Sequence, residues 1–273
     1  SDAELRASSD ITLTHDIDFV SQVYQYVGAP YVTPTDLPMT TFSRPSGGYG
    51  VTTAGVLVWF GAGALRVTDA GLTVEPTATN IDPNSLTIGG AGWTTNGSPI
   101  VTQNFAAAPD GSVTAVRVQS TATNSGPWRG SINLTAGSAY TRSIWLKDNG
   151  GSVKTVTLGV GQAVFGGSGS DRNVTFNVST GVLTGVDAVY TSTAVRQAAE
   201  GWWRVSLTFT PTSTATANFT IYGTAAGADF LLWNHQPEPG VVATSDITTA
   251  GAATTRNADV LASSDAVISP TIV

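Results

Sequence analysis

The sequence predicts an all-β protein, a β-sandwich of the jelly-roll kind. Short runs of alternating apolar and polar residues recur between residues 86 and 240, and clusters of Gly, Asn, Asp and Ser separate them. No long segment places apolar residues at helical spacing in the same region. About eight short strands at this spacing are typical of two antiparallel sheets that pack face to face.

Eight runs are the candidate strands. They occupy residues 114–120, 130–135, 140–148, 153–160, 173–179, 202–209, 218–223 and 229–234. Turn residues lie between them at 109–112, 148–152, 166–171 and 179–181. The sandwich domain is therefore expected to span residues 86–245.

The chain outside the sandwich has a different character. Residues 1–40 contain one ordered element of uncertain type at 11–28, where alternation gives way to roughly helical spacing, followed by a Pro-rich connector. Residues 41–85 are expected to be a connecting β segment that packs on the sandwich. Residues 246–273 are rich in Ala, Thr and Ser and are expected to form an extended C-terminal tail.

Composition excludes several classes of function. The 273 residues carry a net charge of −7 and no basic run, so neither nucleic acid nor an anionic membrane is an expected partner. No apolar run is long enough to span a membrane. The absence of Cys excludes disulfides and thiol catalysis. Only 11% of residues are charged, so Thr, Ser, Asn and Gly must solvate the surface.

Catalytic motifs are also missing, and we expect no enzyme activity. The two histidines, His15 and His235, lie far apart, and neither GxSxG nor HExxH occurs. The Gly-rich stretches at 47–50 and 159–169 lack the lysine of a phosphate-binding loop. A carboxylate pair such as Glu200 with Asp187 stays open as a glycosidase alternative.

No organic cofactor is expected, and a structural calcium ion at one candidate site stays open. Asp229 stands just before a candidate strand, where oxygen ligands could hold a structural calcium ion.

The stretch GWWRVSLTFT (201–210) contains two adjacent tryptophans at the start of an alternating run. Neighbouring side chains on a strand point to opposite faces. Trp203 shares its parity with the apolar residues of the run, while Trp202 shares its parity with Arg204. We therefore predict that Trp203 is buried in the core and that Trp202 is more exposed, on a polar face.

The same parity places other aromatic and arginine side chains on outward faces. Outward positions in the candidate strands are mostly Thr, Ser and Asn, interrupted by Trp145, Tyr222 and Arg129, and Trp128 precedes Arg129 at a strand start. Aromatic planes can stack on the C–H face of a sugar ring, and planar donors can bind its hydroxyls. The predicted carbohydrate-binding residues are Trp128, Arg129, Trp145, Trp202, Arg204 and Tyr222. For each aromatic, the alternative is a structural role at the edge of the core.

Several stretches resemble a module of tailed-phage virions and phage-like particles. They are TFSRPSGGYG (41–50), GWTTNG (92–97), PDGSVTAVRV (109–118), AGSAYTRSIWLK (136–147), GWWRVSLTFT and DFLLWNHQPEPGVVATSDITT (229–249). Such modules occur in tail fibres, spikes and head decorations, including those of gene transfer agents, and are similar to carbohydrate-binding jelly rolls. The sequence departs from the pattern at Pro237, a residue that weakens strand pairing.

The resemblance implies a virion-surface adhesin that acts outside the cell and binds host capsular or surface polysaccharide. By the same analogy, residues 1–40 attach the protein to capsid or tail proteins, and a homo-oligomer is expected. The resemblance carries over no catalytic residues. Two alternatives remain: a glycan-binding module of a polysaccharide-degrading enzyme, and a purely structural particle decoration protein.

Overall fold

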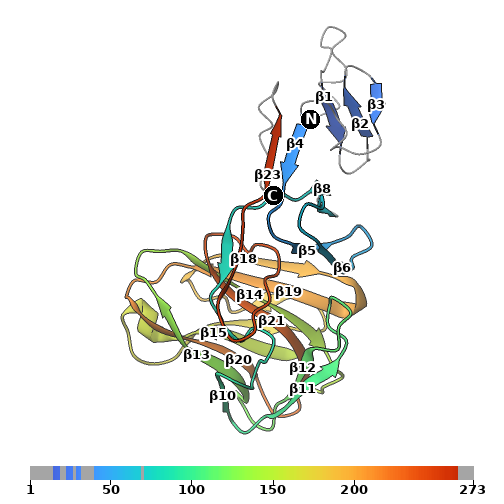
Figure 1. Cartoon of the computed structure of the whole chain (residues 1–273). Helices are drawn as coiled ribbons and strands as arrows, with labels where there is room; N and C mark the ends of the chain where they lie inside the picture. The colour runs from blue at the N-terminus through green and yellow to red at the C-terminus, as the bar shows by residue number, and fades with distance from the viewer. Residues whose placement is uncertain (1–14, 19–22, 27–28, 32–39, 69–70, 264–273) are drawn as a thin grey trace.

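A computed structural model describes residues 15–18, 23–26, 29–31, 40–68 and 71–263 of the chain. Two six-stranded antiparallel sheets form a sandwich (Figure 1). Sheet 1 has the order β10 (Trp93–Asn96), β13 (Gly126–Leu134), β20 (Ala215–Gly223), β15 (Thr155–Val160), β16 (Arg172–Asn177) and β17 (Leu183–Thr184). Sheet 2 has the order β11 (Ile100–Ala106), β12 (Ala115–Gln119), β21 (Asp229–Pro239), β14 (Tyr140–Asp148), β19 (Trp202–Phe209) and β18 (Tyr190–Gln197). The predicted all-β sandwich is confirmed.

The remaining elements are short. One three-stranded sheet contains β1 (His15–Asp18), β2 (Val23–Tyr26) and β3 (Ala29–Tyr31). Four strand pairs are β4 (Thr40–Ser43) with β23 (Val260–Ser263), β5 (Gly48–Val51) with β6 (Leu57–Phe60), β7 (Val67–Thr68) with β8 (Gly71–Leu72), and β9 (Ala78–Asn80) with β22 (Thr254–Arg256). Two 3₁₀ turns, η2 (Gln162–Phe165) and η3 (Ala199–Gly201), complete the described elements.

The segments on either side of the sandwich pair with each other. Strand β22 follows the sandwich and pairs with β9, which precedes it, and β23 pairs with β4 in the same way. The element of uncertain type at 11–28 contains β1 and β2 in its described part. Most of the predicted 1–40 segment, and residues 264–273 of the predicted tail, lie outside the described residues.

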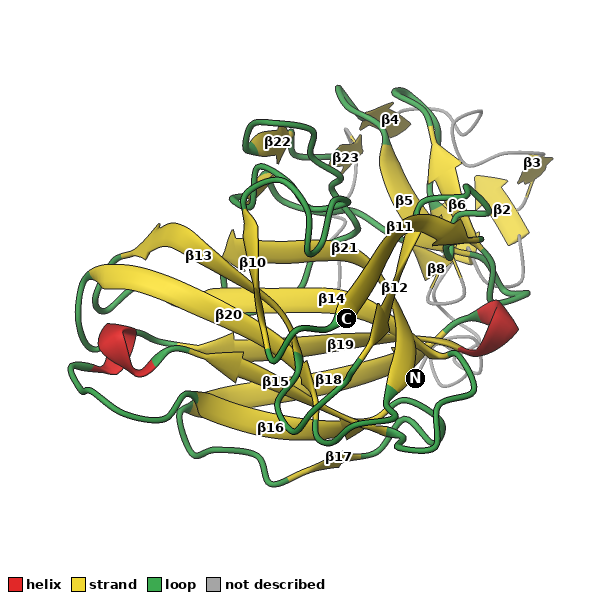
Figure 2. Cartoon of the chain, turned by 90° about the horizontal axis from the view of Figure 1, so that it is seen from below, coloured by secondary structure: helices red, strands yellow, loops and turns green. Residues whose placement is uncertain are grey.

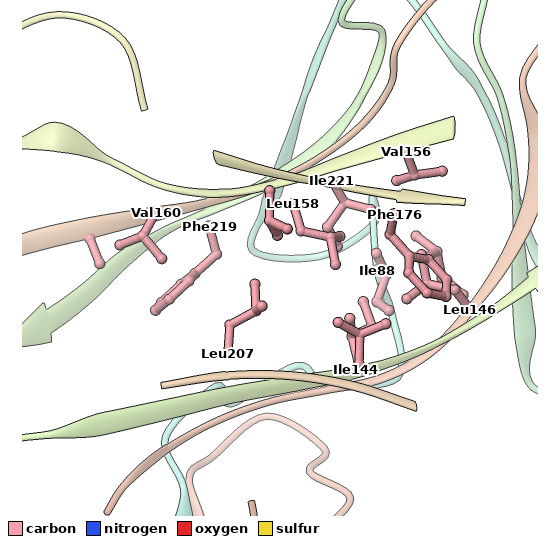
Figure 3. Packing of buried hydrophobic residues seen from close by; sticks show 14 of the residues in the cluster. Ile88, Ile144, Leu146, Val156, Leu158, Val160, Phe176, Leu207, Phe219 and Ile221 are labelled. Carbon is pink, nitrogen blue, oxygen red and sulfur yellow. The ribbon is translucent and has the colours of Figure 1, made fainter. Parts of the chain in front are cut away.

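The main core fills the space between the two sheets, as Figure 3 shows for the labelled side chains. Alternation explains it, because every second residue of a strand points into the sandwich wherever no β-bulge interrupts the pattern. All the inward residues expected from parity except Trp203, which is partly buried, are buried there: Ile132, Leu134, Ile144, Leu146, Val156, Leu158, Val160, Val174, Phe176, Val178, Val205, Leu207, Phe209, Phe219 and Ile221.

A second apolar cluster lies on the other side of sheet 2. Val51 and Leu57, from the β5–β6 hairpin, pack there with Trp145, Trp202 and Trp233 from the three central strands of the sheet. We call the segments that cover this side, residues 48–60 and 240–249, the covering layer. Strands β21, β14 and β19 of sheet 2 are thus largely buried on both faces, so their outward positions are apolar as well as polar.

Side chains at the end of β21 hold residues 240–249 of the covering layer in place. Gln236 accepts a hydrogen bond from the backbone N–H of Ile247 at 2.7 Å. Glu238 accepts one from the backbone N–H of Thr244 at 2.9 Å and another from its hydroxyl at 2.6 Å. Pro237 stays within the strand opposite Arg142, so strand pairing continues through it. The stretch WNHQPE (233–238) therefore has a structural role.

Candidate functional site

Two predicted binding tryptophans are buried. Trp145 has 0% and Trp202 has 1% of its surface exposed, and the indole N–H of Trp145 donates to Asp246 at 2.9 Å. The parity assignment was right, since both point away from the main core. The exposure prediction was wrong, because the covering layer seals that face of sheet 2. Trp203 lies on the core side as predicted but at its edge, only partly buried.

The two predicted binding arginines have structural partners. Arg129 is buried, and it forms an ion pair with Asp82 at 2.8 Å and donates to the carbonyl of Gly92. Its predicted place on an outward polar face is therefore wrong, because the β-bulge after Arg129 reverses the parity, and Arg129 lies opposite the core residue Phe219 on the inward side of sheet 1. Arg204 lies on sheet 2 and donates to the Ser143 hydroxyl at 2.9 Å. Neither arginine shares a face with the remaining two predicted residues.

Trp128 and Tyr222 lie together on the outward face of sheet 1, which we call the open face. In Figure 2, strands β13, β20, β15 and β16 of this sheet lie in front of the strands of sheet 2. Outward positions on these strands are exposed or partly exposed, except at Gly126, Gly159 and Thr220. The open face is therefore the accessible face of the sandwich.

Side chains on the open face form two rows across the strands. The first row runs through Thr94, Trp128, Thr220, Gly159 and Asn173, which are consecutive partners in strand register. The second row runs from Asn96 and its partner Gly126 to Tyr222, whose backbone lies against Gly126, and on through Thr157, Thr175 and Thr184. Directly opposed residues on neighbouring strands have their Cβ atoms roughly 5 Å apart. Each row therefore combines one aromatic ring with hydroxyl and amide groups.

A β-bulge sets the position of Trp128. The register of β13 against β20 shifts between Arg129 and Ile132, where Ser131 has a positive φ of 63°. Bulges bend a strand and redirect its side chains. A methyl group at Gly130 would lie 2.8 Å from the Trp128 ring and 3.3 Å from the Asn218 amide oxygen. Glycine at this position therefore leaves room for the indole to lie flat on the sheet beside Asn218.

Gly159 makes a similar gap at the centre of the first row. The Asn173 and Thr220 side chains lean over it, so a methyl group there would collide with both. Asn173 Oδ1 and Thr220 Oγ1 are buried and have no partner with full hydrogen-bond geometry within the described part of the chain, although the Thr220 hydroxyl lies close enough to Asp171 to lower the pKa of that carboxyl group. Unpaired polar groups of this kind cost free energy, and a ligand that pairs them recovers it.

One carboxyl group borders the open face. Burial raises the pKa of Asp171, and the neighbouring Thr220 hydroxyl and Arg142 only partly oppose that rise. Burial also raises the pKa of Tyr222 to about 12, with a further contribution from Asp171. The phenol is therefore neutral at neutral pH and can both donate and accept a hydrogen bond.

A buried cation supports the open face from inside the sandwich. Arg142, on sheet 2, is 1% exposed, and its guanidinium donates to the carbonyl oxygens of Gly159 at 2.9 Å and Thr220 at 3.1 Å. It also donates to His235 Nε2 at 3.1 Å. His235 Nδ1 in turn contacts Asp82 at 2.7 Å. Burial lowers the pKa of Arg142 to about 10, so the group stays charged at neutral pH.

The combined chemistry suits a neutral, hydroxyl-rich ligand. The two aromatic rings can stack against a sugar ring. The neighbouring amides and hydroxyls, and the bordering carboxyl group of Asp171, can form hydrogen bonds with its hydroxyls. Sequence reasoning found Trp128 and Tyr222 but missed Asn173, Asn218 and Thr220. The last two alternate with core residues in the run NFTIY, so the same parity could have found them.

Asp229 has partners that a calcium ligand would have to give up. Its carboxylate forms a two-point ion pair with Arg117 and accepts from the Asn149 amide at 2.9 Å. No group of three or more His, Asp or Glu side chains that could hold a metal occurs among the described residues. The calcium site at Asp229 stays a prediction. In the same part of the chain, no helix has the length and apolar character needed to cross a membrane.

Comparison with solved structures finds distant likenesses. The CBM22-1–CBM22-2 tandem domain of Paenibacillus barcinonensis Xyn10C is 15% identical with a TM-score of 0.42, over 63% of this chain and 48% of that one. The CBM22-1–GH10 modules of Clostridium thermocellum endo-1,4-β-D-xylanase 10B, complexed with xylohexaose, are 14% identical with a TM-score of 0.41. That match covers 64% of this chain and 30% of that one.

A phage protein is similar to the same degree. The enzymatically active domain of bacteriophage CBA120 tailspike protein 4 is 13% identical with a TM-score of 0.38, over 59% of this chain and 22% of that one. This chain thus spans less than half the length of each of these three structures. No protein-family model and no curated protein sequence matches the chain.

Proposed function

We propose that this protein is a non-catalytic glycan-binding protein and that the open face of sheet 1 binds a neutral polysaccharide. The observation that carries the proposal is the first row, in which Trp128 lies opposite Thr220, and the unpaired oxygens of Thr220 and Asn173 follow along the row on the two sides of Gly159. A glycan chain with one ring stacked on Trp128 could run across the strands, so that hydroxyls of successive rings lie over Thr220 and Asn173. A small rotation of the Asn173 amide would then bring its donor or acceptor to the sugar.

The setting we propose is the surface of a tailed phage or phage-like particle. The stretches quoted above resemble virion modules of that kind, and the host capsular or surface polysaccharide would be the ligand. Residues 1–40 would attach the chain to capsid or tail proteins. A shallow sheet face with few charges is expected to bind one glycan chain weakly. Several copies on one particle, or a homo-oligomer, would supply avidity.

Affinity electrophoresis in gels that contain the host polysaccharide tests the proposal. The wild-type protein is expected to be retarded, and Trp128→Ala is expected to bind at least about tenfold more weakly, because it removes the stacking plane. Phe105→Ala is the matched control, since Phe105 is an aromatic residue that is 42% exposed on sheet 2. Both variants should retain the wild-type unfolding midpoint to within a few degrees.

Three outcomes would contradict the proposal. Equal retardation of the wild type and Trp128→Ala would show that the glycan does not bind at Trp128 on the open face. Absence of retardation by any host glycan would favour a purely structural decoration protein. Shortening of the polysaccharide during incubation would show an enzyme. Binding to encapsulated and capsule-free cells separates capsule from other surface glycans.

A further inference from the structure

Trp59, on β6, is the exposed tryptophan of this protein. All seven tryptophans lie in the described part of the chain, and among them only Trp59 is exposed, over 58% of its surface. Single exposed apolar side chains are common on protein surfaces and need no function. Trp59 differs from such a residue in two ways, because its ring is fixed in place and it borders a pocket.

The β5–β6 hairpin fixes the ring. Tyr49 lies directly opposite Trp59 in strand register, and its ring meets the indole edge-on at a centroid distance of 5.0 Å. Tyr49 is itself held, since its hydroxyl donates to Asp110 at 3.2 Å and its ring packs edge-on against Trp233. A methyl group at Gly47 would collide with the indole, so only glycine lets the backbone lie against it. The indole is therefore oriented before any ligand binds, which lowers the entropy cost of binding.

The pocket beside Trp59 has a volume of about 130 Å³. It lies between the β5–β6 hairpin, residues 246–248 of the covering layer and strand β22. Its lining residues are Ser46, Gly47, Trp59, Asp246, Ile247, Thr248, Thr254, Thr255 and Arg256. Small-molecule sites usually measure roughly 300–1,000 Å³, so a pocket of this size suits one ring of a larger ligand.

Three threonines bring hydroxyl groups to the lining. Thr254 and Thr255 are exposed, and Thr248 is partly exposed. The Thr255 hydroxyl contacts the Thr79 hydroxyl at 2.9 Å, which orients it on the surface of the β9–β22 pair. A hydroxyl group both donates and accepts hydrogen bonds. The lining can therefore pair with a ligand that carries hydroxyls of its own.

The charged residues of the lining are neutralised within the protein. Arg256 is 4% exposed, lies 3.3 Å from Glu75 and donates to the carbonyl of Pro76 at 3.2 Å. Asp246 is 2% exposed and lies 3.4 Å from Arg204. A charged ligand would lose hydration in the pocket without gaining a counter-charge, which costs free energy. The pocket therefore favours a neutral ligand.

We propose that this pocket binds a single pyranose ring of a neutral saccharide, stacked on Trp59 and paired with the threonine hydroxyls. Such a ring carries both the apolar C–H face that stacks on an indole and the hydroxyls that threonines bind. Because the pocket takes one ring, its ligand would be the end or a side branch of a glycan. The pocket lies on the sheet 2 side of the sandwich and is separate from the open face of sheet 1, so it would stand if that face bound nothing.

Two-dimensional NMR of the isotope-labelled full chain tests the proposal, because it resolves the indole N–H signal of each tryptophan. The Trp59 signal is assigned by its disappearance in Trp59→Phe. The probes are the methyl α- and β-glycosides of D-glucose, D-galactose, D-mannose and D-xylose. At least one glycoside is expected to shift the Trp59 signal and the backbone N–H signals of Thr254 and Thr255 along one saturable curve.

The Thr254 and Thr255 signals then measure binding in the variants. Trp59→Ala should bind the same glycoside at least about tenfold more weakly, and Trp59→Phe should lose less, because phenylalanine keeps a smaller stacking ring. Phe105→Ala is the matched control and should bind as the wild type does, since Phe105 is an aromatic residue that is 42% exposed on sheet 2. Because Trp59 is exposed, the urea midpoint of Trp59→Ala should stay close to that of the wild type.

Three results would overturn the proposal. The first is that no glycoside shifts the Trp59 signal, and the second is unchanged binding in Trp59→Ala. The third is a Trp59 signal that responds to protein concentration and to no glycoside, since a second copy of the chain would then cover the pocket. The Trp128 signal reports on the open face separately, so a shift at Trp59 without one at Trp128 would support the pocket alone.

Discussion

The Arg142 guanidinium donates a hydrogen bond of 3.1 Å to the carbonyl oxygen of Thr220, across the space between the two sheets. A charged side chain in a sandwich core is costly unless its donors are paired. Here they bind the carbonyls of Thr220 and Gly159 and the ring of His235. The centre of the open face is thereby tied to the opposite sheet.

Substitution of Arg142 by Met should destabilise the protein by about 3 to 5 kcal/mol, the usual cost of breaking a buried charged network. Two carbonyls and the His235 ring would lose their donor. Arg117→Met is the control, since its ion pair with Asp229 is partly exposed and should contribute less than about 1 kcal/mol. Urea denaturation measures both. A smaller loss for Arg142→Met than for Arg117→Met would show that the network does not support the fold.

The free energy of unfolding should decrease when the pH is lowered, because His235 titrates. Burial, aided by Arg142 and Arg129 and opposed by Asp82, lowers the pKa of His235 from 6.5 to about 4. Between these values the unfolded chain binds a proton that the folded chain does not. The free energy of unfolding therefore decreases as the pH drops from about 6.5 to 4, by up to roughly 3 kcal/mol, and is fully retained above that window.

Urea midpoints at pH 7.5, 6 and 5 measure this dependence in the wild type and in His235→Gln. The variant should be less stable at pH 7.5 but should lose less stability on acidification. Glu238 and Asp171, whose pKa values are raised by burial, contribute with the opposite sign in both proteins, so comparison of the two slopes isolates the histidine. Equal slopes would exclude His235 as the group responsible.

The adjacent tryptophans should differ in stability and not in glycan binding. Trp202 is 1% exposed in the second cluster, so Trp202→Ala should cost about 3 to 5 kcal/mol. Trp203 lies partly buried at the edge of the main core, and Trp203→Ala should cost clearly less. Denaturation midpoints give the two values. An equal or larger cost for Trp203→Ala would show that the covering layer adds little at Trp202.

Alternation predicted most of the sandwich because a period of two follows directly from strand geometry. The runs 140–148 and 202–209 coincide with β14 and β19. Strand β18 was missed, since its outward and inward positions are largely polar and exposed at the edge of sheet 2. Strands β10 and β11 were missed for a similar reason: exposed Thr, Asn and Gln interrupt their pattern.

The candidate site was only half predictable. Parity says which side chains share one face of a strand, but it does not say what covers that face. Trp128 and Trp202 were both predicted to bind sugars, yet one lies on the open face of sheet 1 and the other beneath the covering layer. That layer comes from residues far from β19 in sequence, around Leu57 and Asp246, whose packing no local pattern reveals.

The last prediction concerns Gly159, which lies at the centre of the first row on the open face. Gly159 lies under the Asn173 and Thr220 side chains, and a methyl group there would push both away from their positions. Both obstacles are the ends of side chains, so Gly159→Ala should fold with a modest loss of stability while polysaccharide binding in affinity gels falls severalfold. Gly61→Ala is the control, because no atom lies within 4 Å of the added methyl group. Unchanged binding in Gly159→Ala would place the glycan elsewhere than over this central row.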